Sequence, residues 1–294
     1  MVARSDARLS RTKRRLRWGS TVSARSLFVA TLAALSSGCA PAWVRTPVET
    51  GVHGSVMAAL RYGSLDGFAQ TPAGGMPGTT SRERPTLDEV GIHDAIAGEA
   101  DLHLGWGADA LFVDAVPMRV SGDRRLGSEL TSHGTTFPAG VTAHAHFHFD
   151  QYRIGYEHQF RWRNGSGTTF SVAPAIGLTL FAFDYTLTAA PDLSAARSYV
   201  QAAPQIGVSA AWHPEGRFTL SGAVLGWPSP PTDLATVSVR LTGEYALWQQ
   251  PPYSAAATLG IGYDYTDFED SQHVPNHVHV DDGPLLLAGM KLAF

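Results

Sequence analysis

The chain has 294 residues, a formal net charge of −4 and a mean hydropathy of −0.06. It contains no run of about 18 or more apolar residues, which excludes a transmembrane helix and leaves strands as the only way to span a membrane. The single cysteine excludes an internal disulfide and a site built from several thiolates.

The first forty residues have the character of an export signal. Basic residues precede a short apolar run at residues 27–35, which suits the core of a signal peptide. The sequence Ser-Ser-Gly-Cys ending at Cys39 resembles a lipobox, in which the cysteine becomes the lipidated first residue. Cleavage after Ala40 is the alternative. We therefore predict a signal peptide over residues 1–39 and a periplasmic linker over residues 40–50.

Removal of the leader changes the charge of the mature chain. Residues 1–40 carry eight basic residues and one acidic residue, so their loss shifts the formal net charge from −4 to −11. An acidic chain of this kind argues against nucleic acid as a partner.

From residue 51 onward, apolar residues alternate with polar or small residues, which is typical of strands with one face in lipid and one in a lumen. The last segment shows this most clearly, because Leu286, Met290 and Phe294 share one face and Lys291 lies on the other. A terminal phenylalanine on such a strand resembles the signal by which bacterial outer-membrane proteins are recognised for insertion. The resemblance implies outer-membrane lipid and the barrel-assembly machinery as partners.

The strand count depends on residues 141–188, where the apolar face changes near Asp150 and again near Phe181. A tight turn at Asp150 would give eleven strands and put the chain ends on opposite sides of the membrane. A single hairpin about residues 164–167, with opposing residue numbers summing to 332, gives ten strands and attributes both changes to paired bulges.

We therefore predict an all-β fold, a single closed antiparallel barrel of ten strands over residues 51–294 with both ends periplasmic. Short connections lie inside and the long ones, 64–96, 121–140 and 267–282, lie outside. Four tryptophans at the inner strand ends are expected to form an aromatic girdle: Trp106, Trp162, Trp212 and Trp248. The predicted strands are 51–63, 97–106, 109–120, 141–163, 168–188, 199–212, 217–226, 235–248, 253–266 and 283–294.

The lumen of this barrel is predicted to be filled by charged side chains. A ten-stranded barrel is only slightly wider than the eight-stranded kind that side chains fill. Ion pairs there would stabilise the barrel and not act in catalysis. The expected network is Arg153, Glu157, Arg161, Arg240 and Glu244, and Arg61, Glu99, Asp101, Arg119 and Asp264 are also expected to point inward.

Three histidines on one predicted strand suggest a metal site. His144, His146 and His148 share a face that we expect to point into the outer lumen, and the pairing sum places Asp184 opposite His148. Imidazoles with a carboxylate are suitable ligands for zinc or copper. The alternative is that they are polar lumen residues. A second set in the last predicted outer loop is expected to be solvated: His273, His277, His279, Asp281 and Asp282.

These features predict a non-enzymatic surface or binding protein of the bacterial outer membrane, with an unidentified extracellular ligand. In strand number and size the chain also resembles the omptin-type outer-membrane proteases, which implies a hydrolase as the alternative. The acidic pair and the Asp-His dyad of omptins have no matching loop positions here, and Ser132 beside His133 is only an adjacent pair. No catalytic residue is predicted. A narrow, porin-like channel is the third hypothesis.

Overall fold

The computed structural model describes residues 43–46, 51–72, 84–228, 233–272 and 274–294. The part from Trp43 to Phe294 forms one compact unit. The predicted signal peptide, its Cys39 and the loop residue His273 lie outside the described residues. In the described ranges, no helix is long and apolar enough to cross a membrane.

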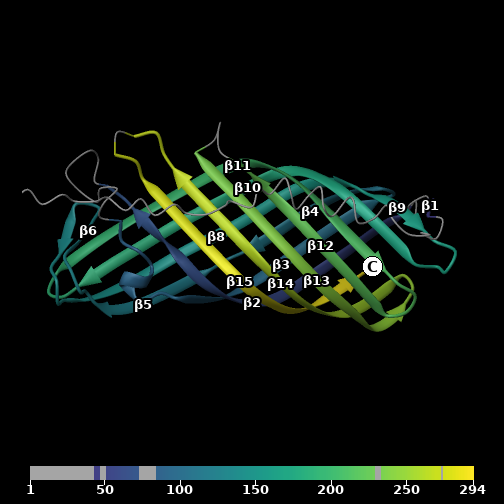
Figure 1. The fold of residues 1–294 in the computed structure, drawn as a ribbon, viewed down its shortest axis with the longest axis horizontal. Helices are drawn as coiled ribbons and strands as arrows, with labels where there is room; N and C mark the ends of the chain where they lie inside the picture. Colours follow the sequence, from purple (N-terminus) through teal and green to yellow (C-terminus); the bar gives the residue numbers. More distant parts are fainter. Residues whose placement is uncertain (1–42, 47–50, 73–83, 229–232, 273) are drawn as a thin grey trace, which may run out of the picture. The chain divides into compact units, whose positions relative to one another are not determined.

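The unit is a closed antiparallel barrel of ten strands, as predicted (Figure 1). Each strand pairs with the next, and the last pairs with the first. Two of the ten are interrupted, so each of these carries two labels. The strands are β2 (Val52–Gln70), β3 (Asp94–Trp106), β4 with β5 (Asp109–Val116, Arg119–Arg125), β8 with β9 (Thr142–His158, Phe160–Arg163), β10 (Thr169–Ala189), β11 (Leu193–His213), β12 (Phe218–Trp227), β13 (Leu234–Gln250), β14 (Tyr253–Glu269) and β15 (His277–Ala293).

The remaining elements are short. β1 (Val44–Arg45) pairs with β9. It thereby covers the edge of β9, which β4 does not reach because the β4–β8 ladder ends at His158. β6 (Leu130–Ser132) and β7 (Thr135–Phe137) form a small hairpin, and η1 (Asp88–Val90) is one 3-10 turn. The strands are longer on the outer side than predicted, so the outer loops are correspondingly shorter.

The hairpin of β8, β9 and β10 has the predicted register. Phe149 lies opposite Phe183, with residue numbers that sum to 332, and β8 runs through Asp150 without a turn. The predicted paired bulges are wrong, because the β8–β10 register contains no shift. The interruption lies on the neighbouring strand, where Pro117 separates β4 from β5 and the Asp150 carboxylate accepts the Met118 N–H at 3.2 Å.

The apolar face changes near Asp150 because the surroundings of the barrel change there. Odd-numbered residues of β8 point inward throughout, from the charged Arg153 to the apolar Phe147. Even-numbered residues point outward, from the apolar Ile154 to the polar His146. We call the part below this change, with its apolar exterior, the membrane belt, and the part above it, with its polar exterior, the collar.

The membrane belt has the features of a lipid-facing surface. Leu60, Ile96 and Leu259 are 67%, 68% and 68% exposed on its outside. The predicted tryptophans lie at the inner strand ends, close to the hairpin turns. The C-terminus lies at this end of the barrel too (Figure 1). Outward tyrosines bound the other edge: Tyr62, Tyr152 and Tyr263. Ten residues of a tilted strand between these edges rise by about 25 Å, as a lipid-facing band requires.

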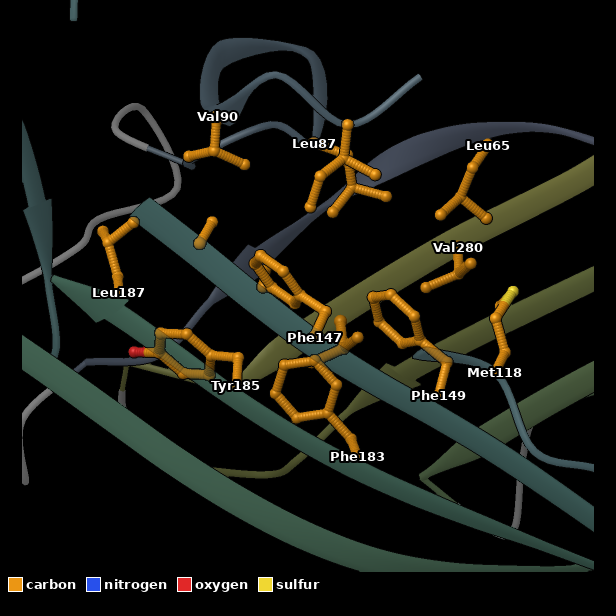
Figure 2. Close-up of a cluster of buried hydrophobic side chains, with 14 of the residues drawn as sticks. Leu65, Leu87, Val90, Met118, Phe147, Phe149, Phe183, Tyr185, Leu187 and Val280 are labelled. Atoms are coloured by element: carbon orange, nitrogen blue, oxygen red, sulfur yellow. The ribbon is translucent and has the colours of Figure 1, made fainter. Parts of the chain in front are cut away.

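The collar contains the hydrophobic core of the molecule. Aromatic side chains from β8 and β10 stack in its centre, with ring centroids of Phe147 and Phe149 5.5 Å apart and those of Phe149 and Phe183 5.6 Å apart (Figure 2). Leu87 and Val90, from the segment before β3, pack onto this cluster. The interior of the collar is therefore packed like that of a soluble protein.

Candidate functional site

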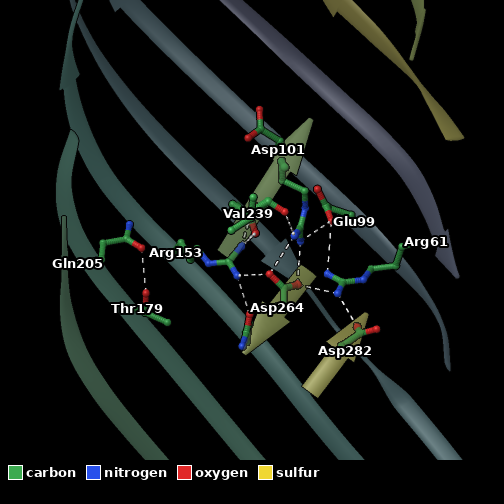
Figure 3. Close-up of polar contacts among 12 residues, drawn as sticks. Arg61, Glu99, Asp101, Arg153, Thr179, Gln205, Val239, Asp264 and Asp282 are labelled. Carbon is green, nitrogen blue, oxygen red and sulfur yellow. Dashed lines mark hydrogen bonds and ion pairs between the residues drawn. The ribbon is translucent and has the colours of Figure 1, made fainter. Parts of the chain in front are cut away.

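Directly below the collar core, the lumen holds a buried group of ion pairs, which we call the arginine cluster (Figure 3). It joins side chains from β2, β3, β4, β8, β13, β14 and β15, so it links strands around the barrel. Its members are Arg61, Glu99, Asp114, Arg153, Arg240, Asp264 and Asp282.

Asp264 lies at the centre of the arginine cluster. Its carboxylate accepts hydrogen bonds from Arg61 at 2.6 Å, Arg240 at 2.7 Å and Arg153 at 3.3 Å. The Asp264 side chain is 6% exposed, so water does little to screen these charges. Removing one partner would leave a buried charge with less compensation, which destabilises the folded barrel.

A β-bulge in β15 aims Asp282 at the arginine cluster. The register shifts between Asp282 and Leu285 against both neighbouring strands, so both side chains point inward. Gly283 in the bulge has φ +154°. Asp282 accepts a hydrogen bond from Arg61 at 2.5 Å, and a Cβ added to Gly63 would lie 2.5 Å from Asp282 Oδ1. The lack of a side chain at Gly63 therefore leaves the room that Asp282 occupies.

Two members of the predicted lumen network, Arg153 and Arg240, lie in the arginine cluster. Glu157 lies nearer the inner end, with its carboxylate 3.4 Å from His103 Nδ1. The other ring nitrogen of His103 is 3.2 Å from Asp101. His103 therefore connects two inward carboxylates, a contact that no spacing in the sequence predicts.

The other predicted network members make separate contacts in the inner half of the lumen. Arg161 donates to Gln159 at 3.0 Å, and Lys291 donates to Glu244 at 2.9 Å. The predicted inward position of Arg119 is wrong, because this residue pairs with His148 and is exposed on the collar surface.

The predicted inward position of the three histidines is also wrong. The inward positions beside them hold buried apolar residues, so His144, His146 and His148 form an outward ladder on the collar. His148 does lie opposite Asp184. His144 Nδ1 is 2.6 Å from the Asp123 carboxylate.

No three potential ligand side chains are arranged to hold a metal ion in the part of the chain that the structure describes. Zinc or copper binding by the histidine ladder therefore stays a prediction. Any such ion would bind on the outside of the collar and not in the lumen.

The two described histidines of the second set, His277 and His279, lie on a strand and not in a loop. β15 begins at His277, and Asp267 of β14 accepts from His277 at 2.8 Å and from His279 at 3.2 Å. The other ring nitrogen of His279 donates to Asp281 at 3.0 Å. These contacts lie on the collar exterior, beyond the membrane belt, and join the outer ends of β14 and β15.

The contact between His279 and Asp267 favours the charged form of each side chain. The hydrogen bond to Asp267, followed by that to Asp281, raises the pKa of His279 above its ordinary value, although burial alone would lower it. Burial would raise the pKa of Asp267, but the hydrogen bonds from His277 and His279 outweigh it and lower that pKa.

Comparisons with known proteins give no specific relative. No family model matches the chain, and no curated protein matches it. Among solved structures, the outer-membrane protease OmpT from Escherichia coli is 11% identical with a TM-score of 0.42, covering 88% of this chain and all of that one. The attachment invasion locus protein Ail of Yersinia pestis is 10% identical with a TM-score of 0.34, covering 82% and 99%. The outer-membrane protein OprG from Pseudomonas aeruginosa is 9% identical with a TM-score of 0.33, covering 84% and 97%.

The assignment of the chain rests on its own architecture. Closed barrels satisfy every backbone hydrogen bond inside a bilayer, and here the barrel carries an apolar belt between tryptophan and tyrosine edges. The chain is a bacterial outer-membrane β-barrel protein.

Proposed function

We propose that this protein is a non-conducting outer-membrane barrel that holds its collar in the external medium as a binding surface. The observation that carries the proposal is that the lumen is blocked at two successive levels. The collar core fills the outer level and the arginine cluster fills the level below it.

Both levels are tightly packed. Phe137, Phe149 and Phe183 in the collar core are 0%, 2% and 1% exposed. Between the core and the arginine cluster lies a cavity of about 10 Å³, which is room for about one water molecule. An ion would have to displace buried side chains at both levels, which argues against a channel along the barrel axis.

The surroundings of Ser132 argue against a hydrolase that uses this residue. Its hydroxyl is 2.8 Å from the Tyr185 hydroxyl, and the residue is 1% exposed. Thr71 contacts the same tyrosine at 2.5 Å. Ser132 therefore belongs to a buried hydrogen-bond group in the collar, where a substrate would not reach it.

The collar exterior favours a cationic ligand. Carboxylates outnumber guanidinium groups on its outward strand positions, in line with the acidic chain expected after removal of the predicted leader. An open hollow of about 470 Å³ at its rim is also lined by Asp233, Asp267, Glu269 and Asp270. The outward carboxylates on the strands are Asp66, Asp94, Asp123, Asp150, Asp184, Asp267, Glu269 and Asp281, and the outward arginines are Arg119 and Arg125.

The blocked lumen is tested by single-channel recording in planar bilayers. The native protein is expected to give no conductance steps above a protein-free bilayer. A Phe147→Ala, Phe149→Ala and Phe183→Ala variant that folds is expected to remain closed too, because the arginine cluster lies below the opened core. Conductance of the native protein would contradict the proposal.

Binding is tested with two polymers of opposite charge on protein in lipid vesicles. Polylysine is expected to bind and to dissociate as salt is raised, whereas heparin is not expected to bind. An Asp123→Asn, Asp184→Asn and Asp267→Asn variant should bind polylysine more weakly. Equal binding of both polymers would contradict a cationic ligand.

A further inference from the structure

In the described part of the barrel wall, some neighbouring strands are joined by a ladder over only part of their length, as for β11 beyond Ile206 on its β12 side and for β3 beyond Ala100. The β3–β4 ladder ends at the pair Ala100 and Ala115, and β5 beyond it pairs with β8 alone. The outer part of β3 pairs only with β2, although Cα atoms of β3 and β5 come within 8 Å of each other. We call this unpaired boundary between β3 and β5 the seam.

The segment before β3, residues 85–93, closes the seam and is called the strap. Backbone hydrogen bonds hold the strap to β2: the Leu87 N–H donates to the Gly67 carbonyl at 3.0 Å, and the Leu65 N–H donates to the His93 carbonyl at 2.8 Å. The strap therefore continues the barrel wall on the β2 side.

On the β5 side, the strap is held by packing, by an exposed ion pair and by a hydrogen bond that Arg124 donates to the Asp88 carbonyl. A Cβ added to Gly122 of β5 would lie 2.4 Å from the Val90 carbonyl oxygen, so backbones touch closely there. Arg124 lies 3.2 Å from Asp88, and both side chains are about half exposed or more. Exposed pairs of this kind hold elements together weakly. The strap is thus fixed to β2 by backbone hydrogen bonds, and to β5 by packing and one arginine side chain.

A cavity with two chemically different sides lies behind this part of the wall. Val116 and Met118, on either side of the β4–β5 interruption, line it together with the aromatic ring of Phe149. Arg61 and Asp264 of the arginine cluster line its other side. A molecule that entered here would meet apolar side chains first and charged ones at the far end.

We propose that the wall opens laterally at the seam, with the strap and the outer part of β3 moving away from β5. The seam starts at the outer edge of the membrane belt, where the nearest molecules are lipids. The opening therefore admits the acyl chain of an amphiphile to the boundary between the collar core and the arginine cluster. This goes beyond the proposed function and does not depend on it, since no path along the barrel axis is needed.

The first test is hydrogen exchange of the full chain in lipid vesicles. Amides of residues 85–99 are expected to exchange at least tenfold faster than those of residues 180–188 of β10, which have ladders on both sides. Equal protection of the two segments would overturn the proposal.

The second test locks the seam with a disulfide in a Cys39→Ser background, because Cys39 is the only native cysteine. Ile96→Cys with Arg119→Cys joins outward positions across the seam, and Ala100→Cys with Ala115→Cys is the matched control on the same two barrel strands inside the ladder. The readouts are strap exchange and labelling of the lumen by a lipid with a diazirine in its acyl chain.

Oxidation of the seam pair is expected to slow strap exchange at least tenfold and to abolish labelling of Met118 and Phe149. Oxidation of the control pair should change neither. No labelling of these residues in the reduced protein, or equal effects of both disulfides, would overturn the proposal.

Discussion

The membrane belt and the collar are built from the same strands and have opposite chemistry. Along β8, the belt puts Ile154 outside and Arg153 inside, whereas the collar puts His146 outside and Phe147 inside. The backbone passes from one to the other without a change in register. The difference therefore comes from the surroundings of the strand and not from its conformation.

The two regions show how the surrounding solvent determines where apolar residues lie. In the belt, lipid accepts apolar side chains on the outside, so the lumen is left with charges that have to pair in the arginine cluster. In the collar, water surrounds the barrel and apolar side chains gather inside. A barrel that extends beyond the bilayer thus has a second, conventional core.

The largest expected effect is on the arginine cluster of the belt. Arg61→Ala leaves Asp282 without its arginine partner and removes one of the three arginines around Asp264, so we expect the free energy of unfolding to fall by about 3–5 kcal/mol. Urea unfolding in lipid vesicles measures this. Arg119→Ala, on the collar exterior, is the control and should change stability by less than about 0.5 kcal/mol. Similar losses in both variants would contradict the distinction between the regions.

The same substitution to arginine at two outward positions of β8 tests where the membrane belt and the collar meet. Ile154→Arg places a charge in lipid and is expected to destabilise the barrel by about 2–4 kcal/mol. His146→Arg places the same charge in water and should be within about 0.5 kcal/mol of the native protein. If both cost the same, the boundary near Asp150 is misplaced.

A smaller effect concerns the contact between β14 and β15 in the collar. Because the pKa of His279 is raised, the contribution of His279 to stability is complete below the ordinary pKa of 6.5. This contribution is lost as pH rises through the raised pKa. Because the pKa of Asp267 is lowered, the contribution of Asp267 to stability is complete above pH 3.8, the ordinary pKa, and is lost in stronger acid. Amides of residues 277–281 should therefore be less protected at pH 9 than at pH 6 after correction for intrinsic exchange. The effect, at most about 1 kcal/mol in this partly exposed contact, should be absent in His279→Gln.

The smallest expected effect is metal binding by the outward histidine ladder. Calorimetric titration with zinc or copper should release heat with the native protein and less with a His146→Ala and His148→Ala variant. Equal heats from the two proteins would end the metal hypothesis.

The sequence was sufficient to predict the strands, their number and the hairpin register, because alternation and turn residues are local signals. It did not reveal which side of the collar wall is apolar. Phe147 alternates with polar neighbours in the same way whether it faces lipid or a core, and treating it as lipid-facing put His146 in the lumen.

The arginine cluster was only partly predictable for a different reason. Inward positions of single strands identified Arg153, Arg240 and Asp264 as lumen residues. Asp282 reaches Arg61 only because of the β15 bulge, and the one-residue shift that this causes has no periodic signature in the sequence.

The length of the β10–β11 hairpin has a consequence for large molecules that approach the cell. Each strand has 21 residues, and the outward apolar positions of β10 end near Leu180. At about 3.3 Å per residue and a tilt of about 40°, the remaining residues carry the hairpin tip roughly 20 Å above the bilayer. The turn at Asp192 therefore stands clear of the lipid headgroups, where an antibody or a phage tail can reach it, and it is the natural place to insert an epitope.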